Sequence, residues 1–151
     1  MAHPDSPLRV RERVLAQHDL LRLRLQGLAE GVDALRAGRL EVDELRIRCW
    51  ETLALLRAHT KDEEQWLLPV LREADGFGPV RVDALRDEHR TQAHELAEAM
   101  DALRDAREPE SLARAIEGLV KRILDDMDEE ERTYLDPNLL KESLVTTGFI
   151  G

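Results

Sequence analysis

Two residues that can bind metal, His59 and Glu63, lie four positions apart in a stretch whose hydrophobic spacing predicts a helix. Residues four apart project from the same face of a helix, about one turn from each other. This face is the apolar one, because Leu56, Trp66 and Val70 continue the three-and-four spacing on either side. A buried carboxylate is costly unless it is paired or bound to a metal. The stretch therefore indicates a polar site inside a helical core.

Three further predicted helices also place metal-binding residue types on their apolar faces. The predicted metal ligands are His18, His59, Glu63, His89, Asp126 and Glu130. In helices that run alternately up and down, a rise of about 1.5 Å per residue puts all six at a similar height. Three imidazoles and three carboxylates are too many for one ion with an open position, and they suit two ions bridged by carboxylates. Glu63 and Glu130 are the expected bridges, and the donor set suits iron, manganese or zinc.

The elements that must position these residues form an all-α, up-down-up-down four-helix bundle. Hydrophobic residues make up 42% of the chain, charged residues 36% and aromatic residues only 3%, a balance typical of helical bundles. Gly31 and Gly38 bracket the end of the first helix. The predicted helices span about residues 7–30, 43–73, 79–107 and 110–135, with a C-terminal tail at 138–151. A length of 151 residues without a linker predicts a single domain over residues 1–151.

The charge and cysteine content limit the partners and the compartment. The net charge is −10 and the arginines are scattered among acidic residues, which argues against nucleic acid as a partner. No apolar run reaches the roughly 20 residues of a membrane helix, so we expect no membrane partner. The single cysteine, Cys49, precludes an intrachain disulfide and fits a reducing compartment. The first residues lack the pattern of a signal peptide, and we expect a cytoplasmic protein.

The pattern of His18, His59-x-x-x-Glu63, His89 and a later acidic residue four before Glu130 resembles the hemerythrin-like (HHE cation-binding) domain family. The resemblance covers about residues 8–137. It implies a hemerythrin-like four-helix bundle with a non-haem di-iron centre that binds dioxygen, nitric oxide or iron itself. On this basis we expect two metal ions, with iron first and manganese or zinc as alternatives. The expected partner is a small diatomic or peroxide ligand that the centre binds or senses, and we expect no turnover of an organic substrate.

The chain departs from the family pattern at two positions. Asp126 stands where the second His-x-x-x-Glu motif of the family has its histidine. Oxygen-carrying members also have a histidine four residues after the one that corresponds to His89, where this chain has Ala93, and His94 comes one position later. The predicted site is therefore richer in oxygen ligands and poorer in nitrogen ligands than the family pattern.

The register of the last helix leaves one alternative open. A shift by one residue would pair Met127 with Glu131 in place of Asp126 with Glu130. Met127 is a poor iron ligand, so we prefer the pair Asp126 and Glu130. Three acidic residues beside the predicted ligands are expected to be solvated, or to hold a ligand imidazole from outside: Glu64, Glu129 and Glu131.

Two other functions remain as rivals. An oxidase-type enzyme would use the open metal position, and the hydroxyl of Tyr134, one turn past Glu130, could then reach the site. A metal-free helical module would instead use its acidic surface or its C-terminal tail to bind another protein. Metal content separates the second rival from a metal-binding protein.

Overall fold

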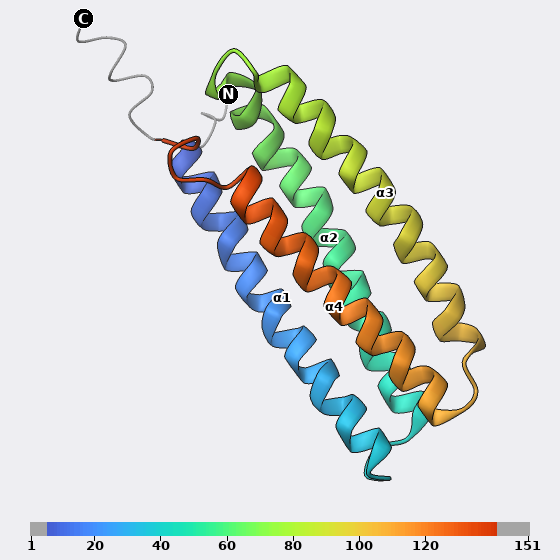
Figure 1. The fold of residues 1–151 in the computed structure, drawn as a ribbon. Helices are drawn as coiled ribbons and strands as arrows, with labels where there is room; N and C mark the ends of the chain where they lie inside the picture. The colour runs from blue at the N-terminus through green and yellow to red at the C-terminus, as the bar shows by residue number, and fades with distance from the viewer. Residues whose placement is uncertain (1–5, 142–151) are drawn as a thin grey trace, which may run out of the picture.

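The computed structural model describes residues 6–141, which form four α-helices joined by short loops (Figure 1). The helices are α1 (Pro7–Arg36), α2 (Val42–Ala74), α3 (Gly78–Asp105) and α4 (Pro109–Thr133). Successive helices run in opposite directions, and both α1 and α3 pack beside α2 and α4. This arrangement confirms the predicted four-helix bundle. Most of the predicted C-terminal tail, from residue 142 onward, lies outside the described residues.

The first helix is longer than predicted, because Gly31 does not end it. Helix α1 continues to Arg36, and Gly31 is buried against α2. A Cβ atom at Gly31 would lie only 2.7 Å from Leu45 Cδ1, so the glycine permits a close approach of α1 and α2. The turn comes instead at Gly38, whose φ of 76° lies in the left-handed region. The other three helices begin and end within two residues of the predicted positions.

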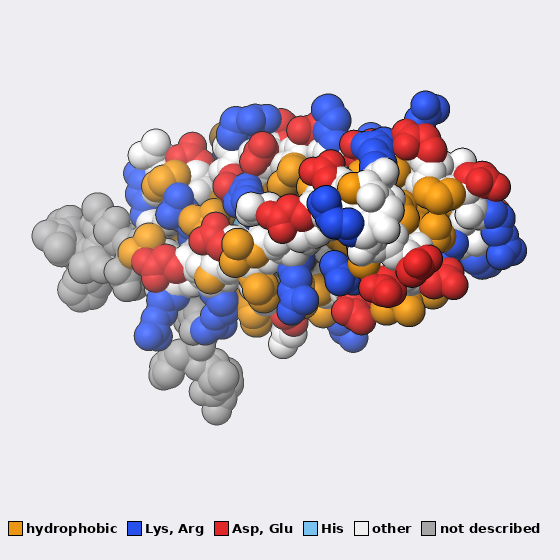
Figure 2. Space-filling view, turned by 90° about the horizontal axis from the view of Figure 1, so that it is seen from below, with side chains coloured by type: hydrophobic (Ala, Val, Ile, Leu, Met, Phe, Trp, Pro, Cys, Tyr) orange, Lys and Arg blue, Asp and Glu red, His pale blue; other side chains and the backbone are white. Residues whose placement is uncertain are grey.

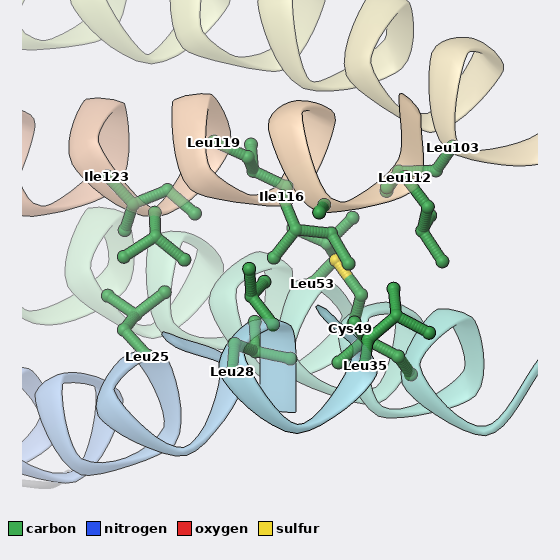
Figure 3. Packing of buried hydrophobic residues seen from close by; sticks show 14 of the residues in the cluster. Leu25, Leu28, Leu35, Cys49, Leu53, Leu103, Leu112, Ile116, Leu119 and Ile123 are labelled. Carbon is green, nitrogen blue, oxygen red and sulfur yellow. The ribbon is translucent and has the colours of Figure 1, made fainter. Parts of the chain in front are cut away.

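The buried apolar residues form two clusters along the bundle. The first cluster fills the half that contains the loops at residues 37–41 and 106–108, and includes Leu25, Leu53 and Ile116 (Figure 3). The second cluster fills the other half and includes Val14, Leu67, Leu85, Tyr134 and Leu140. The residues that separate the two clusters along the helices are the polar ones predicted to bind metal.

The buried face of α4 differs from the predicted one. We expected Asp126 to continue this face, but it is only partly buried, and Thr133 two turns later is exposed. Met127 and Tyr134 are buried in their place, at 4% and 2% exposure. Either pair, Asp126 with Thr133 or Met127 with Tyr134, continues the helical spacing of buried residues from Ile123 onward. The structure buries the thioether and the aromatic ring because these groups cost less to remove from water than a carboxylate.

The end of α3 is held by a buried arginine of α2. Arg46 donates hydrogen bonds to the carbonyl oxygens of Leu103, Arg104 and Ala106, at the point where the helix ends. These carbonyls have no partner within the helix. The guanidinium therefore replaces a C-terminal cap and fixes α3 against α2.

The substitution Arg46→Met should destabilise the protein by about 1.5–3 kcal/mol, because it leaves buried carbonyl oxygens without a donor. Urea unfolding followed by circular dichroism measures the change. Arg48→Met is the matched control, since Arg48 is an exposed arginine on the same helix. Equal stability of the two variants would contradict a capping role for Arg46.

The visible surface in Figure 2 carries acidic and basic side chains interspersed, without a region of a single sign. None of the helices within residues 6–141 combines the length and the apolar character needed to cross a membrane.

Candidate metal centre

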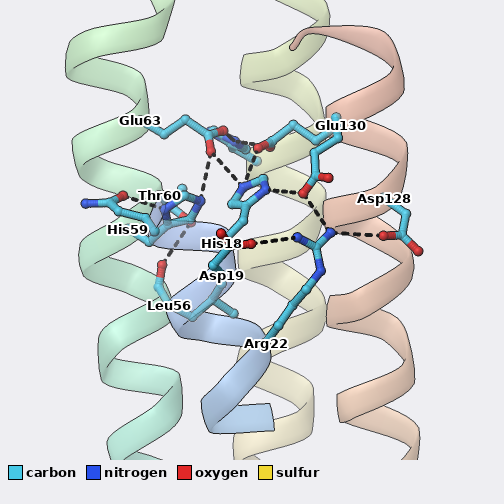
Figure 4. A network of polar contacts seen from close by, with 12 residues as sticks. His18, Asp19, Arg22, Leu56, His59, Thr60, Glu63, Asp128 and Glu130 are labelled. Carbon is cyan, nitrogen blue, oxygen red and sulfur yellow. Dashed lines mark hydrogen bonds and ion pairs between the residues drawn. The ribbon is translucent and has the colours of Figure 1, made fainter. Parts of the chain in front are cut away.

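Five of the six predicted ligands meet inside the bundle, between the two apolar clusters. Helix α1 contributes His18, α2 contributes His59 and Glu63, α3 contributes His89 and α4 contributes Glu130. None of the five is more than 7% exposed. Figure 4 shows His18 between the carboxylates of Glu63 and Glu130, with His59 beside it. The four helices therefore build one buried polar layer.

The Nε2 atoms of the three imidazoles face the two carboxylates from two sides. On one side, His59 Nε2 lies 2.8 Å from Glu63 Oε2, and His18 Nε2 lies 3.0 Å from Glu130 Oε1. On the other side, His89 Nε2 lies 3.1 Å from Glu63 Oε1 and 3.7 Å from Glu130 Oε2. Each carboxylate thus presents one oxygen to His18 and His59 and the other oxygen to His89.

The first of these two positions is compact. One ligand atom from each of His18, His59, Glu63 and Glu130 fits within 4.8 Å of the others. The rings of His18 and His59 meet edge to face, with centroids 4.8 Å apart. Two nitrogen and two oxygen donors around one point match the ligand number and type of a transition-metal site.

The outer nitrogen of each imidazole donates a hydrogen bond to an acceptor on a neighbouring helix. The pairs are His18 with Glu131 at 2.7 Å, His59 with Gln17 at 2.6 Å and His89 with Glu64 at 2.9 Å. Ionised carboxylates and amide oxygens only accept, so the Nδ1 atoms carry the protons. The Nε2 lone pair of each neutral ring then points into the centre, as a metal ligand requires.

Three buried polar atoms at the centre have no hydrogen-bond partner: His18 Nε2, Glu63 Oε2 and Glu130 Oε1. His18 Nε2 and Glu130 Oε1 are close, but their orientation is not that of a hydrogen bond. Buried polar atoms without partners are rare because each costs about 1–3 kcal/mol. All three belong to the compact first position. A cation bound there would satisfy them together, so the residues present fit a metal ion.

Without metal, the two central carboxylates titrate as a coupled pair. Burial favours the neutral form of Glu63, but the nearby imidazoles of His18, His59 and His89 outweigh it and hold the pKa of Glu63 well below its usual value. Burial and the negative charge of Glu63 raise the pKa of Glu130. The pair therefore keeps Glu63 ionised and makes Glu130 the carboxyl that protonates more easily.

The same carboxylates act on the imidazoles. Burial alone would lower the pKa of His18 and of His89, but Glu130 and Glu63 raise both values to about 10. The metal-free layer is thus held together by protonated imidazoles facing carboxylates. A metal ion would replace these protons.

Comparison with protein families agrees with this geometry. The model of the hemerythrin HHE cation-binding domain matches residues 9–136. The chain belongs to this family. Searches among curated proteins and among solved structures gave no match. The family match and the buried histidine–glutamate cluster together establish a hemerythrin-type cation-binding domain.

The structure places three other sequence candidates away from the centre of this hemerythrin domain. Asp126 is partly buried on the wall between α3 and α4, and it does not join the clustered ligand atoms. Burial, together with nearby acidic residues and against the effect of Arg122, raises its pKa. The side chain of His94 is 78% exposed and pairs with Glu98. Tyr134 is buried, and its hydroxyl donates to Glu88 instead of facing the ligands.

A cavity of about 560 Å³ adjoins the ligands between α2, α3 and α4. Leu96 of α3 is only partly buried because it lines this space. Small residues leave it open, among them Ala93 of α3 and Gly118 of α4. A Cβ atom at Gly118 would have no neighbour within 4 Å. The cavity gives small molecules access to the centre.

The outer partners of the imidazoles were only partly foreseen. Glu64 and Glu131 hold imidazoles, as the sequence allowed, whereas Glu129 is exposed and pairs with Arg132. Gln17 was missed. Its position in the sequence could have identified it, because all three outer partners lie next to a central residue. Gln17 precedes His18, Glu64 follows Glu63 and Glu131 follows Glu130.

The metal-free protein should lose stability as the pH rises from 6.5 to 10. His18 and His89 have a pKa of about 10 when folded and an ordinary value of 6.5, so the folded state binds more protons in this range. Their stabilising contribution is complete below pH 6.5 and disappears as the pH passes about 10. The raised pKa of Glu130 acts in the same direction, and the lowered pKa of Glu63 matters only below about pH 4.5. Thermal melts in the presence of a chelator measure this slope.

The control for the pH series is His94→Gln, which should keep the slope because His94 is outside the layer. The double variant His18→Gln/His89→Gln should flatten it. A melting temperature that stays constant or rises between pH 6.5 and 10 would contradict the charge state assigned to the layer.

Removing the outer partner of His18 should weaken metal binding. Glu131→Leu deletes the acceptor that orients the imidazole, and affinity should fall by about 10–100-fold. Asp128→Leu is the matched control: Asp128 and Glu131 both bind Arg22, but Asp128 does not contact His18. Competition with a chelator of known affinity measures the change, and an equal loss in both variants would assign the effect to Arg22 instead.

Proposed function

We propose that this protein holds a dinuclear non-haem iron centre, which binds or senses dioxygen, nitric oxide or peroxide, or serves to hold iron. The observation that carries this proposal is the two-sided arrangement of the central carboxylates. Glu63 and Glu130 each direct one oxygen to the side of His18 and His59 and the other to the side of His89. Two bridging carboxylates arranged in this way favour two ions over one.

The two positions differ in their ligands. The first has two imidazoles and one oxygen from each carboxylate, whereas the second has only His89 with the remaining two oxygens. The second position thus has fewer protein ligands, which leaves room for a small exogenous ligand. The cavity adjoins both positions, because His18, His59 and His89 all line it.

Mixed nitrogen and oxygen donors support iron, with manganese or zinc as alternatives. A pair of iron ions supplies affinity for dioxygen, nitric oxide or peroxide and the capacity to exchange electrons. The protein's own residues hold the ions, fix the imidazole tautomers and keep bulk water away with apolar clusters on both sides. None of these residues is placed as a nucleophile.

An oxidase-type enzyme remains the second candidate, and the size of the cavity is the observation that favours it. A volume of about 560 Å³ exceeds the need of a diatomic ligand and lies in the range of sites for organic molecules. Mass spectrometry of the protein after aerobic exposure separates the candidates. A ligand-binding protein should keep its mass, while oxidation of its own side chains would favour the oxidase.

Anaerobic titration with ferrous iron should show about two ions per chain, measured by elemental analysis after removal of free metal. His89→Leu should reduce the number to one, because it removes the only imidazole of the second position. Glu63→Leu should abolish binding, because both positions share Glu63. The exposed Glu51 of α2 provides the control, and Glu51→Leu should still bind two ions.

Binding of a single ion by the parent, unaffected by His89→Leu, would contradict the dinuclear centre. No uptake of iron, manganese or zinc would contradict the proposed function and favour the metal-free interaction module.

A further inference from the structure

The surface between α3 and α4 carries a cleft of about 510 Å³ whose lining is mostly acidic. Three carboxylates come from each helix and the cleft lining contains one basic residue. The charged residues are Asp87, Glu88 and Glu95 from α3, and Asp125, Asp126, Glu129 and Arg122 from α4. Asp87, Asp125 and Glu129 also pair with exposed cations at the rim, and Glu95 pairs with Arg122 within the lining. Such surface pairs are weak and exchange readily, and the acidic residues of the lining still outnumber the basic one. The cleft therefore attracts cations.

The cleft shares a wall with the cavity that reaches the metal centre. Four residues line both spaces: Gln92, Glu95, Arg122 and Asp126. Asp126 lies one helical turn before Glu130, so both project from neighbouring positions on α4. Carboxylates thus continue from the surface to the buried ligands.

An independent observation supports cation binding at the inner end of this path. Glu63 Oε2 and Glu130 Oε1 are buried, have no hydrogen-bond partner and belong to residues that line the inner cavity. These two carboxylate oxygens can accept a hydrogen bond or bind a cation, and no protein donor forms a hydrogen bond to them. The remaining wall of the cavity is less suited to cations, because it includes the exposed arginines Arg57 and Arg114.

We propose that divalent metal cations enter through the acidic α3–α4 cleft, and that Asp126 receives each cation at the shared wall and passes it to Glu130. The inference rests on the proposed function, in which the buried layer holds metal. It gives Asp126 a transit role in place of a permanent ligand role. A cleft in which one sign of charge predominates can raise the association rate of an oppositely charged ligand, by up to about 10–10³-fold where the charge is uniform, and salt reduces the effect.

The experiment measures the rate of cobalt(II) uptake by the full chain, using the visible absorption of the bound ion in a stopped-flow instrument. The test variant is Glu95→Gln/Asp126→Asn/Glu129→Gln, which removes three charges from the cleft. The control, Glu30→Gln/Glu44→Gln/Glu51→Gln, removes three charges from exposed positions on α1 and α2. At low salt, the test variant should load about tenfold more slowly than the parent, and the control should load like the parent.

Two further measurements sharpen the test. The difference between test variant and parent should shrink at high ionic strength, where screening over about 3 Å at 1 M salt removes the attraction. Arg122→Gln should load faster than the parent, because it removes the basic residue of the cleft lining. The final stoichiometry should remain that of the parent in every variant.

The possible results distinguish a failure of the proposed entry path from a failure of metal binding at the centre. Equal loading rates in test and control variants would overturn the path through the cleft, although the parent still binds metal. A lower final stoichiometry in the single variant Asp126→Asn would overturn the transit role and make Asp126 a permanent ligand. Absence of uptake by the parent would overturn the proposed function as well.

Discussion

The bundle depends on the burial of two carboxylates at its centre. Glu63 and Glu130 lie side by side in an apolar interior, where two negative charges are costly without compensation. The imidazoles of His18 and His89 supply that compensation when protonated, and a bound cation would supply it when they are neutral. The layer divides the apolar interior into two clusters, and each helix must contribute to it at one height. The packing of the helices and the geometry of the site therefore depend on each other.

The outer hydrogen bonds show how closely the site and the fold are connected. His18 of α1 binds Glu131 of α4, His59 of α2 binds Gln17 of α1, and His89 of α3 binds Glu64 of α2. Every one of these bonds crosses between two helices that pack side by side. Arg22 extends the first of them by joining Glu131 to Asp128. A shift of one helix would misplace an imidazole, so the outer partners hold both the bundle and the orientation of the ligands.

The contact between α3 and α4 is the open part of the structure, and its openness has a physical cause. Small side chains such as Ala93 and Gly118 fill little space, and α3 packs more closely on α2 than on α4. The cavity on this side is lined by all five central residues, His18, His59, Glu63, His89 and Glu130. The opening between α3 and α4 therefore reaches the whole buried polar layer.

The sequence by itself determined the four helices and five of the residues that meet in the central polar layer, because hydrophobic spacing shows which residues face the interior. A histidine or glutamate at such a position, as at His18 or Glu63, can be recognised without a structure. Spacing did not determine the rotation of α4 to within one residue, because Asp126 and Met127 both continue the apolar stripe from Ile123. The tertiary structure decided for Met127, since burying the thioether costs less than burying another carboxylate beside Glu130. It also decided the role of Gln17, which is an ordinary polar residue of α1 until the bundle places the imidazole of His59 against it.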